Sequence, residues 1–353
     1  MRSTVAASAV IGSLLALRPV LALAHGAPPP DPTFPGVLLA WSFDPLPLVA
    51  VGAAAFAYLR AVREVNAAHP RSPVPSARPV AFLAGLAAIL LALQSPVDRY
   101  ETALISVHMV QHMLLQFVAA PLLLLGAPVT LALRVAPPPV RAGLIAVLHS
   151  RALRTATHPL VAWTVFVAVN WGWQFSPLYN LALESDFVHY LQHAVYLGSA
   201  LLFWWPIAGI DPAPRRLAFP GRAAYLAMAI PQNSFLGITL MSTSPDLYPH
   251  YQTLVRDWGP SVVEDLTIAG SVMWGMGAMV FVIAHGRRLD AGRRAPHAPR
   301  RVASRGAGGG RGGDRRLPGG ADAAKEATTA NTRRYTQWQM TDDGTVAVNS
   351  LSQ

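Results

Sequence analysis

The stretch ALISVHMVQHMLLQFVAAPLLLL, which spans Ala103–Leu125, decides the fold class of this chain. It contains no aspartate, glutamate, lysine or arginine. A helix of about 20 apolar residues is long enough to cross the hydrocarbon core of a bilayer. The stretch therefore predicts a transmembrane helix. Its two histidines, His108 and His112, need partners there because polar side chains in lipid are costly.

The composition of the whole chain agrees with a membrane protein. Of the 353 residues, 52% are hydrophobic and only 13% are charged, and the mean hydropathy is +0.35. A soluble domain carries about 25% charged residues, so this chain cannot cover a soluble surface. The chain has no cysteine, which excludes disulfides, zinc–thiolate sites and thiolate-based copper carriers.

Seven segments have the apolar character expected of membrane spans, and the second needs its flanks to reach across the bilayer. The connections between them contain turn and breaker residues, as in HPRSPVPSARP and VAPPPVR. We therefore predict an all-α fold, a polytopic membrane helix bundle of about seven transmembrane helices. The predicted spans are Gly36–Leu59, Pro79–Leu93, Ala103–Leu125, Pro159–Phe175, Phe187–Ile207, Ala223–Met241 and Val262–Ala284.

The two ends of the chain differ from this membrane domain. Residues 1–24 resemble a secretory signal peptide, with Arg2 before an apolar run and the cleavage sequence Ala22-Leu23-Ala24. Residues 25–285 then form the predicted seven-helix membrane domain. Residues 286–353 are basic, polar and low in complexity, which predicts a disordered cytoplasmic tail. The tail lacks an RNA-binding signature, so we expect no nucleic-acid partner.

The arginines predict how the bundle is oriented, because cytoplasmic loops carry an excess of lysine and arginine. With seven spans, the loops after the first, third and fifth spans and the start of the tail lie on one side, and they hold most of the loop arginines. The opposite loops are acidic and hold only Arg99 and Arg256. We therefore predict a multi-pass protein of the bacterial plasma (inner) membrane, with its mature N-terminus outside and its C-terminus in the cytoplasm.

Two spans carry a pair of histidines near the predicted outer surface. His108 and His112 lie in the third span, and His189 and His193 lie in the fifth. Residues four apart share one helix face, with about 5–6 Å between their Cβ atoms. The two pairs together predict a four-histidine metal site, and imidazole suits copper, zinc and iron. Nearby residues are expected to accept hydrogen bonds behind the ligands: Gln111, Gln192, Glu101, Glu184 and Asp186.

Three other residues are weaker ligand candidates. Met109 and Met113 would favour Cu(I), but each is offset from a histidine by one position, about 100° around the helix. His25 would become the mature N-terminus, where its amine and imidazole can chelate copper. Haem is the rival use of the paired histidines, since one outer haem would take one histidine from each pair. A two-haem membrane cytochrome needs a wider spacing than the rise of about 6 Å between these histidines.

Three separated motifs resemble the CtaG family, the polytopic membrane assembly factors of caa3-type cytochrome c oxidases. SPVDRYETALISVHMVQHMLLQFVAAPLLLLGAP is similar to the family's H-M-x-Q-H-M-L stretch and its L-G-A-P ending. SPLYNLALESDFVHYLQHAVYLGSALLFWWPIAG is similar to its P-x-L-Y, H-x-x-x-H and F-x-W-W-P block. EDLTIAGSVMW resembles its D-Q-Q-x-x-G-x-x-M-W element, with Asp265 in register but Leu266 and Thr267 in place of the glutamines. The resemblance covers roughly residues 35–285.

The resemblance implies a membrane assembly factor, not an enzyme, that helps to mature a haem–copper oxidase by handling or delivering copper at the outer face. Its expected partners are oxidase subunits or other assembly factors. Asp265 is then a fourth weaker candidate for the metal site, where it would orient a ligand or contact the client. The residues alone leave open a copper or small-solute transporter and a haem-binding membrane oxidoreductase. A transporter needs polar residues toward the inner side, where the candidates are Asn170, Gln174, Gln232 and Asn233.

Overall fold

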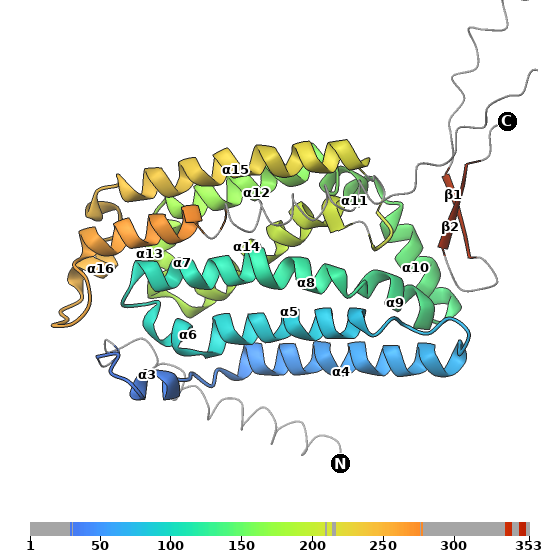
Figure 1. Cartoon of the computed structure of the whole chain (residues 1–353), viewed down its shortest axis with the longest axis horizontal. Helices are drawn as coiled ribbons and strands as arrows, with labels where there is room; N and C mark the ends of the chain where they lie inside the picture. Colours follow the sequence, from blue (N-terminus) through green and yellow to red (C-terminus); the bar gives the residue numbers. More distant parts are fainter. Residues whose placement is uncertain are drawn as a thin grey trace, which may run out of the picture.

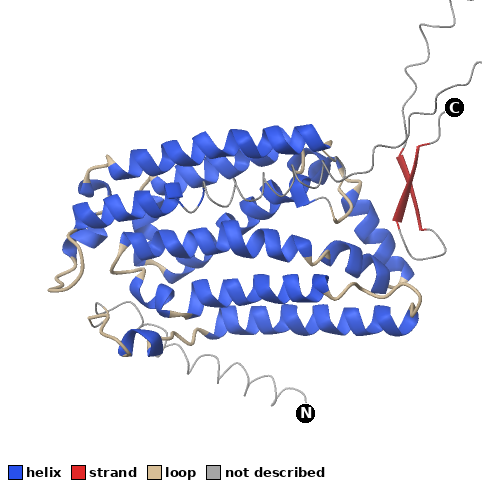
Figure 2. Ribbon diagram, viewed as in Figure 1, coloured by secondary structure: helices blue, strands red, loops and turns tan. Residues whose placement is uncertain are grey.

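The computed structural model describes residues 29, 31–208, 210–213, 217–275, 277, 336–340 and 346–350 of the chain. The predicted signal peptide, residues 1–24, and His25 lie outside the described residues. Within the described part, the membrane domain is built from helices and their connections (Figure 2).

The helices of the membrane domain follow one another with short connections. The first half contains α3 (Gly36–Leu39), α4 (Pro45–Ala68), α5 (Ala77–Gln94), α6 (Pro96–Tyr100), α7 (Ile105–Met113), the π-helix η1 (Leu114–Ala119), α8 (Ala120–Leu125) and α9 (Pro128–Val135). The second half contains α10 (Pro138–Leu148), α11 (Arg151–Ala156), α12 (Pro159–Gln174), α13 (Leu178–Glu184), α14 (Asp186–Ala208), α15 (Phe219–Met241), the 3-10 helix η2 (Pro245–Leu247) and α16 (Pro249–Thr253). Residues 262–275 form a further helix.

Each of the seven predicted spans is helical over most of its length. Three stretches are long and apolar enough to cross a membrane: α4, α5 with α6, and the run from α7 to α9. They correspond to the first three predicted spans. The other four correspond to α12, α14, α15 and the helix at 262–275, and their crossing of the membrane stays a prediction.

The first span starts and ends later than predicted. The sequence analysis placed it at Gly36–Leu59, whereas α4 occupies Pro45–Ala68. Asp44 caps this helix by accepting a hydrogen bond from a backbone amide of the first turn, and the proline after it needs no amide donor there. At the far end, Arg60 and Glu64 form an ion pair of 2.7 Å one turn apart, which supports the helix beyond the predicted end.

The long helices lie along the longest axis of the molecule (Figure 1). α5 packs against α4 on one side and against η1 and α8 on the other, while α14 contacts α12, α8 and η1. The short elements α3, α6, α13 and α16 gather at one end of the bundle, and α9, α10 and α11 lie at the opposite end (Figure 1). We call the first of these the histidine end, because α7 and α14 begin there with their histidine pairs.

Large apolar side chains fill the space between these helices. The main hydrophobic cluster joins α7, α12, α14, α15 and the helix at 262–275, and it includes Phe166, Phe203 and Leu226. A second cluster joins α4, α5 and the run from η1 to α9. Both clusters lie behind the histidine end and give α7 and α14 a rigid support.

The π-helix η1 interrupts the long helical run directly after the histidines of α7. Pro121 follows η1 and has no amide hydrogen, so it cannot bond to the Phe117 carbonyl as an α-helix requires. The wider π turn carries the chain past this missing bond, and such segments are frequent at functional sites. The Gln116 carbonyl accepts a hydrogen bond of 2.9 Å from Trp204 Nε1 of α14. This bond ties the two histidine-bearing helices together.

α15 and the helix at 262–275 approach each other at two glycines. A Cβ atom at Gly237 would lie 2.7 Å from the Gly270 carbonyl oxygen, and one at Gly270 would lie 2.5 Å from the Gly237 carbonyl oxygen. Larger residues would therefore force the backbones apart, whereas glycines let membrane helices pack closely. This contact positions the helix that carries Asp265.

The tail contains a two-stranded antiparallel hairpin. β1 (Thr336–Met340) pairs with β2 (Val346–Ser350), and Trp338 is the register partner of Val348. These two segments lie within the predicted tail, and valine and tryptophan favour strands. Residues 278–335, 341–345 and 351–353 lie outside the described part of the chain.

Candidate metal centre

Three elements bring one glutamate and four histidines together at the histidine end. Glu101 directly follows α6, His108 and His112 lie one turn apart on α7, and His189 and His193 lie one turn apart on α14. None of the five residues is more than 7% exposed. The sequence analysis predicted that the two histidine pairs meet, and they do: the His108 and His189 ring centres are 5.5 Å apart, and those of His112 and His193 are 5.9 Å apart.

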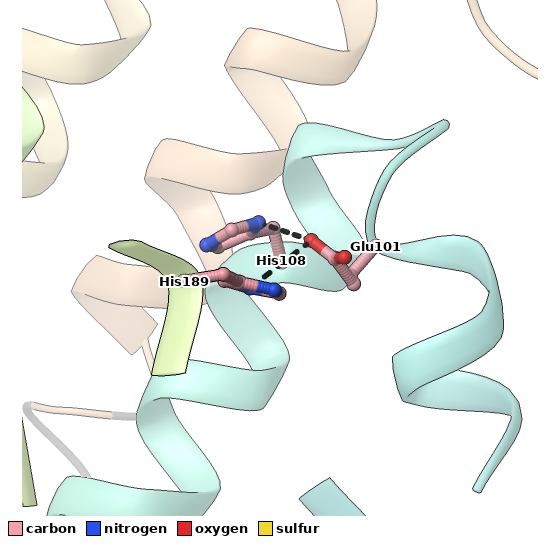
Figure 3. A group of neighbouring side chains, drawn as sticks. All are labelled: Glu101, His108 and His189. Atoms are coloured by element: carbon pink, nitrogen blue, oxygen red, sulfur yellow. Dashed lines mark ion pairs between the residues drawn. The ribbon is translucent and has the colours of Figure 1, made fainter. Parts of the chain in front are cut away.

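Glu101, His108 and His189 form a compact group of possible metal ligands. Glu101 Oε2 lies 2.5 Å from His108 Nδ1 and 3.8 Å from His189 Nε2. These three ligand atoms all lie within 4.8 Å of one another. Figure 3 shows both imidazoles next to the same carboxylate oxygen. One carboxylate and two imidazoles form a ligand set that binds transition-metal ions and leaves a position open for exchange.

The second histidine of α7 contacts the first. His108 Nε2 and His112 Nε2 are 3.0 Å apart, and the two rings are nearly perpendicular at 87°. Without a metal, one of these nitrogens must carry a hydrogen, because two lone pairs would repel each other at this distance. His108 therefore uses both ring nitrogens, one toward Glu101 and one toward His112.

A chain of hydrogen bonds holds His193 from behind. His193 Nε2 lies 3.0 Å from Gln111 Oε1, and Gln111 Nε2 lies 3.0 Å from the Ala92 carbonyl and 3.2 Å from Asp98 Oδ1. The two acceptors orient the amide with its oxygen toward His193, so that His193 carries its proton on Nε2 and its lone pair on Nδ1. A histidine that donates its ring N–H to a fixed acceptor is typical of metal ligands. Gln111 thus has the supporting position that we expected.

Aromatic side chains cover the histidines of α7. The ring centre of Tyr179 lies 5.0 Å from that of His108, and Tyr196 stacks on His112 with 4.1 Å between ring centres. Tyr251 donates a hydrogen bond of 2.9 Å to the Glu101 carbonyl. Burial, followed by the charge of Glu101, raises the pKa of Tyr251 well above its usual range, so this phenol remains a donor. The tyrosines keep the site dry and hold the ligand residues in place.

Asp265 contacts the start of α7 instead of the histidine cluster. Its carboxylate accepts a hydrogen bond of 2.6 Å from the Ile105 amide, one of 3.4 Å from the Ser106 amide, and one from the Ser106 hydroxyl. The residue before α7, Leu104, has no side-chain acceptor, so Asp265 caps the helix from another part of the chain and meets the positive end of its dipole. Asp265 thus helps to position α7, and its role toward a metal ligand or a client stays a prediction.

The remaining candidates lie in different surroundings. Met109 and Met113 are buried in the main hydrophobic cluster, the usual place of core methionines. Glu184 is exposed, and Gln192 is fully buried beside His108.

Glu101 lies closer to the histidines than the sequence analysis predicted. We expected it behind the ligands, whereas its Oε2 atom lies among them. The signal for this position is weak, because residues 101–104 between α6 and α7 are not helical and carry no periodicity. Asp98 accepts a hydrogen bond from Gln111 but was not predicted in any role, and only the packing of α6 against α7 reveals it.

Comparison with known proteins shows the family to which this chain belongs. Residues 56–287, more than half of the chain, match the family model described as cytochrome c oxidase caa3 assembly factor (Caa3_CtaG). This protein belongs to the Caa3_CtaG family. The resemblance seen in the sequence is confirmed, and the matched region contains Glu101 and all four histidines. The family is one of caa3 cytochrome c oxidase assembly factors.

Curated relatives of this Caa3_CtaG protein occur in mycobacteria. Uncharacterized proteins of Mycobacterium bovis and Mycobacterium tuberculosis are each 37% identical over 262 residues, which covers 70% of this chain and 38% of the relative. An uncharacterized protein of Mycobacterium leprae is 33% identical over 258 residues, with the same coverage. This chain therefore spans less than half the length of these relatives. No solved structure matches the chain significantly.

Proposed function

We propose that this Caa3_CtaG protein binds copper transiently at the histidine end and passes it to a caa3-type oxidase or to another assembly factor, without catalysing a reaction. The observation that carries the proposal is the buried contact of Glu101 with His108 and His189, at 2.5 Å and 3.8 Å. Burial of polar and charged groups costs free energy, and a bound cation would offset that cost.

The ligand types and the client together favour copper. Imidazole binds copper, zinc and iron, and a carboxylate is compatible with their divalent ions. The family serves caa3-type cytochrome c oxidases, which the resemblance identifies as haem–copper oxidases. Copper is therefore the metal that both the site and the client accept.

The distribution of charge supports an outward-facing histidine end. The opposite end of the bundle holds α9, α10 and α11 (Figure 1), and these helices carry four arginines. Basic residues favour the cytoplasmic side of a membrane. In this orientation the histidine end faces the outside, where the protein receives and releases copper. The four arginines are Arg134, Arg141, Arg151 and Arg154.

Three of the four amide side chains considered for a transport path donate hydrogen bonds to other parts of the bundle. Asn170 Nδ2 donates to Gln116 Oε1 at 3.0 Å, and Asn233 Nδ2 donates to the Met273 carbonyl at 2.8 Å. Gln174 Nε2 donates to the Tyr248 hydroxyl at 2.7 Å. Hydrogen bonds of this kind join helices within membranes. These contacts favour a site that opens on one face of the membrane over a transporter.

The packing around the histidines also disfavours haem. Tyr179 and Tyr196 lie against the rings of His108 and His112, with 5.0 Å and 4.1 Å between ring centres. A porphyrin bound to either histidine would need the space that these tyrosines fill. Copper needs no such space.

Deletion of the gene tests the proposal. We expect the caa3-type oxidase from the deletion strain to have a reduced copper content and activity. The intact gene on a plasmid should restore both, and excess copper in the medium should restore them in part. Normal copper content and activity in the deletion strain would refute the assembly role.

A further inference from the structure

The ring of His108 faces two different sets of partners. Its Nδ1 atom lies 2.5 Å from Glu101 Oε2, and His189 Nε2 lies 3.8 Å from the same oxygen. Its Nε2 atom lies 3.0 Å from His112 Nε2. The two nitrogens of an imidazole point in diverging directions and have distinct roles, so a single ion cannot bind both.

We infer that the histidine end contains two alternative copper positions that share His108. The outer position consists of Glu101, His108 Nδ1 and His189, as drawn in Figure 3. The inner position consists of His108 Nε2 and His112 Nε2, with His193 as its third candidate ligand, because the His193 ring centre lies 5.9 Å from that of His112. The inference rests on the proposed copper-handling function and adds a second step to it, in which copper moves from one side of His108 to the other.

The distances allow copper at either position after small adjustments. Two nitrogens at about 2.0–2.1 Å from one metal ion, as in protein metal sites, subtend roughly 95° when they are 3.0 Å apart. The inner pair therefore already has the spacing of adjacent ligands. In the outer position, the 2.5 Å contact between Glu101 and His108 must lengthen and the 3.8 Å contact between Glu101 and His189 can stay near its present length.

The protons of His108 allow one position to be filled at a time. A neutral imidazole has one N–H group and one lone pair. With copper on Nδ1, the Nε2–H group donates to His112 Nε2. With copper on Nε2, the Nδ1–H group donates to Glu101 Oε2. When copper moves inward, Nε2 loses a proton and Nδ1 gains one, so the ring carries the same number of protons before and after.

In each copper position, a neighbouring side chain accepts a hydrogen bond from the other ring N–H of His108. Metal-bound histidines usually donate their other ring N–H to a carboxylate or another acceptor. Glu101 is that acceptor when copper occupies the inner position, and His112 is that acceptor when copper occupies the outer one. Both partners are buried, at 1% and 0% exposure, so the contacts do not compete with water.

The ligands also differ in chemical preference. The outer position contains a carboxylate oxygen, which suits the harder ion Cu(II), whereas the inner position contains only imidazole nitrogens. We therefore expect Cu(II) to favour the outer position and Cu(I) to favour the inner one.

Variants that close one position test the inference on the purified full-length protein in detergent. Glu101→Gln with His189→Phe closes the outer position, and His112→Phe closes the inner one while a ring still stacks on Tyr196. Copper is supplied as Cu(I) without oxygen and as Cu(II) in air. The exposed His149, which directly follows α10, gives the control His149→Phe. Elution volume and helical circular dichroism verify that each variant is folded, and His112→Gln replaces His112→Phe if the latter is not.

The inference predicts that each variant with one closed position still binds about one copper ion, with a changed Cu(II) paramagnetic spectrum in the outer-closed variant. The variant with both positions closed should bind none. If the outer-closed variant binds no copper while His112→Phe matches the wild type, the inner position is refuted and the proposed function stands. If His112→Phe binds no copper while the outer-closed variant matches the wild type, the outer position is refuted. If wild-type protein binds no copper, both the inference and the copper role proposed above fail.

Discussion

The histidine end and the middle of the bundle both bury polar side chains between helices, but these side chains are satisfied in different ways. In the middle, Asn170 bonds to Gln116, and Asn233 bonds to a backbone carbonyl. These are donor–acceptor pairs between neighbouring helices. At the histidine end, nitrogen faces nitrogen across 3.0 Å, and one carboxylate oxygen lies near two imidazoles.

The way in which the buried polar groups are satisfied distinguishes a structural polar contact from a binding site. An amide pair is complete by itself and contributes to helix association. Atoms whose lone pairs point at one another repel unless a proton or a cation lies between them. The same contrast holds for the two buried carboxylates, since Asp265 accepts hydrogen bonds from three donors of α7 whereas Glu101 lies next to two imidazoles.

Loss of one histidine from each helix should have the largest effect. We expect His108→Ala with His189→Ala to abolish copper binding, because this change removes two of the three outer ligands and half of the inner pair. Copper per protein, measured by atomic spectrometry after desalting, should fall from about one to near zero. His149→Phe serves as the control. Unchanged copper content in the double variant would show that the metal binds elsewhere.

Two glutamines on the same helical run provide the next test. Gln111→Leu removes the acceptor behind His193, and loss of such a supporting contact typically lowers metal affinity about 10- to 100-fold. A competition titration with a copper chelator measures the change. Equal affinity in wild type and Gln111→Leu would mean that His193 takes no part in the site.

Asp265→Ala should affect stability more than copper content. It leaves the α7 amides at Ile105 and Ser106 without their acceptor, which costs about 1–3 kcal/mol for buried groups. A lower midpoint of thermal unfolding in detergent is the expected result, with Asp265→Asn as the milder variant because it keeps an acceptor oxygen. Copper stoichiometry should persist at low temperature. An unchanged midpoint would show that the cap is not required.

Gln116→Leu should have the smallest effect and is the matched partner of Gln111→Leu. It breaks the bond to Asn170, and hydrogen bonds between membrane helices contribute about 0.6 kcal/mol on average. Copper affinity should equal that of the wild type, because Gln116 contacts no histidine of the cluster among the described residues. If this variant loses copper as Gln111→Leu is predicted to, the contrast between the two regions is wrong.

Much of the fold was predictable because membrane helices have a strong sequence signal. Apolar length located α5 and the run from α7 to α9, and the four-residue spacing placed both histidine pairs on α7 and α14. The start of α4 was missed, since the cap at Asp44 outweighs the apolar residues before it. The two short strands in the predicted tail had no counterpart in the sequence analysis, because five-residue segments carry little periodicity.

The histidines of the site were predictable from the sequence, but the contacts between their side chains and neighbouring residues were not. Periodicity shows that His108 and His112 share a helix face, and it does not show that one ring contacts both Glu101 and His112. That contact depends on the turn between α6 and α7. Asp265 is 157 residues away from His108 in the sequence, so only the packing of α15 with the following helix explains how it reaches α7.

The most direct test of the copper role is the copper content of the client itself. The caa3-type oxidase should be purified from a deletion strain that carries either the wild-type gene or the gene with His108→Ala and His189→Ala, at matched levels of the assembly factor in the membrane. We predict that the wild-type gene restores the copper content and activity of the oxidase and that the variant does not. A variant that restores both would contradict the account, because the histidine end would then be dispensable for copper insertion.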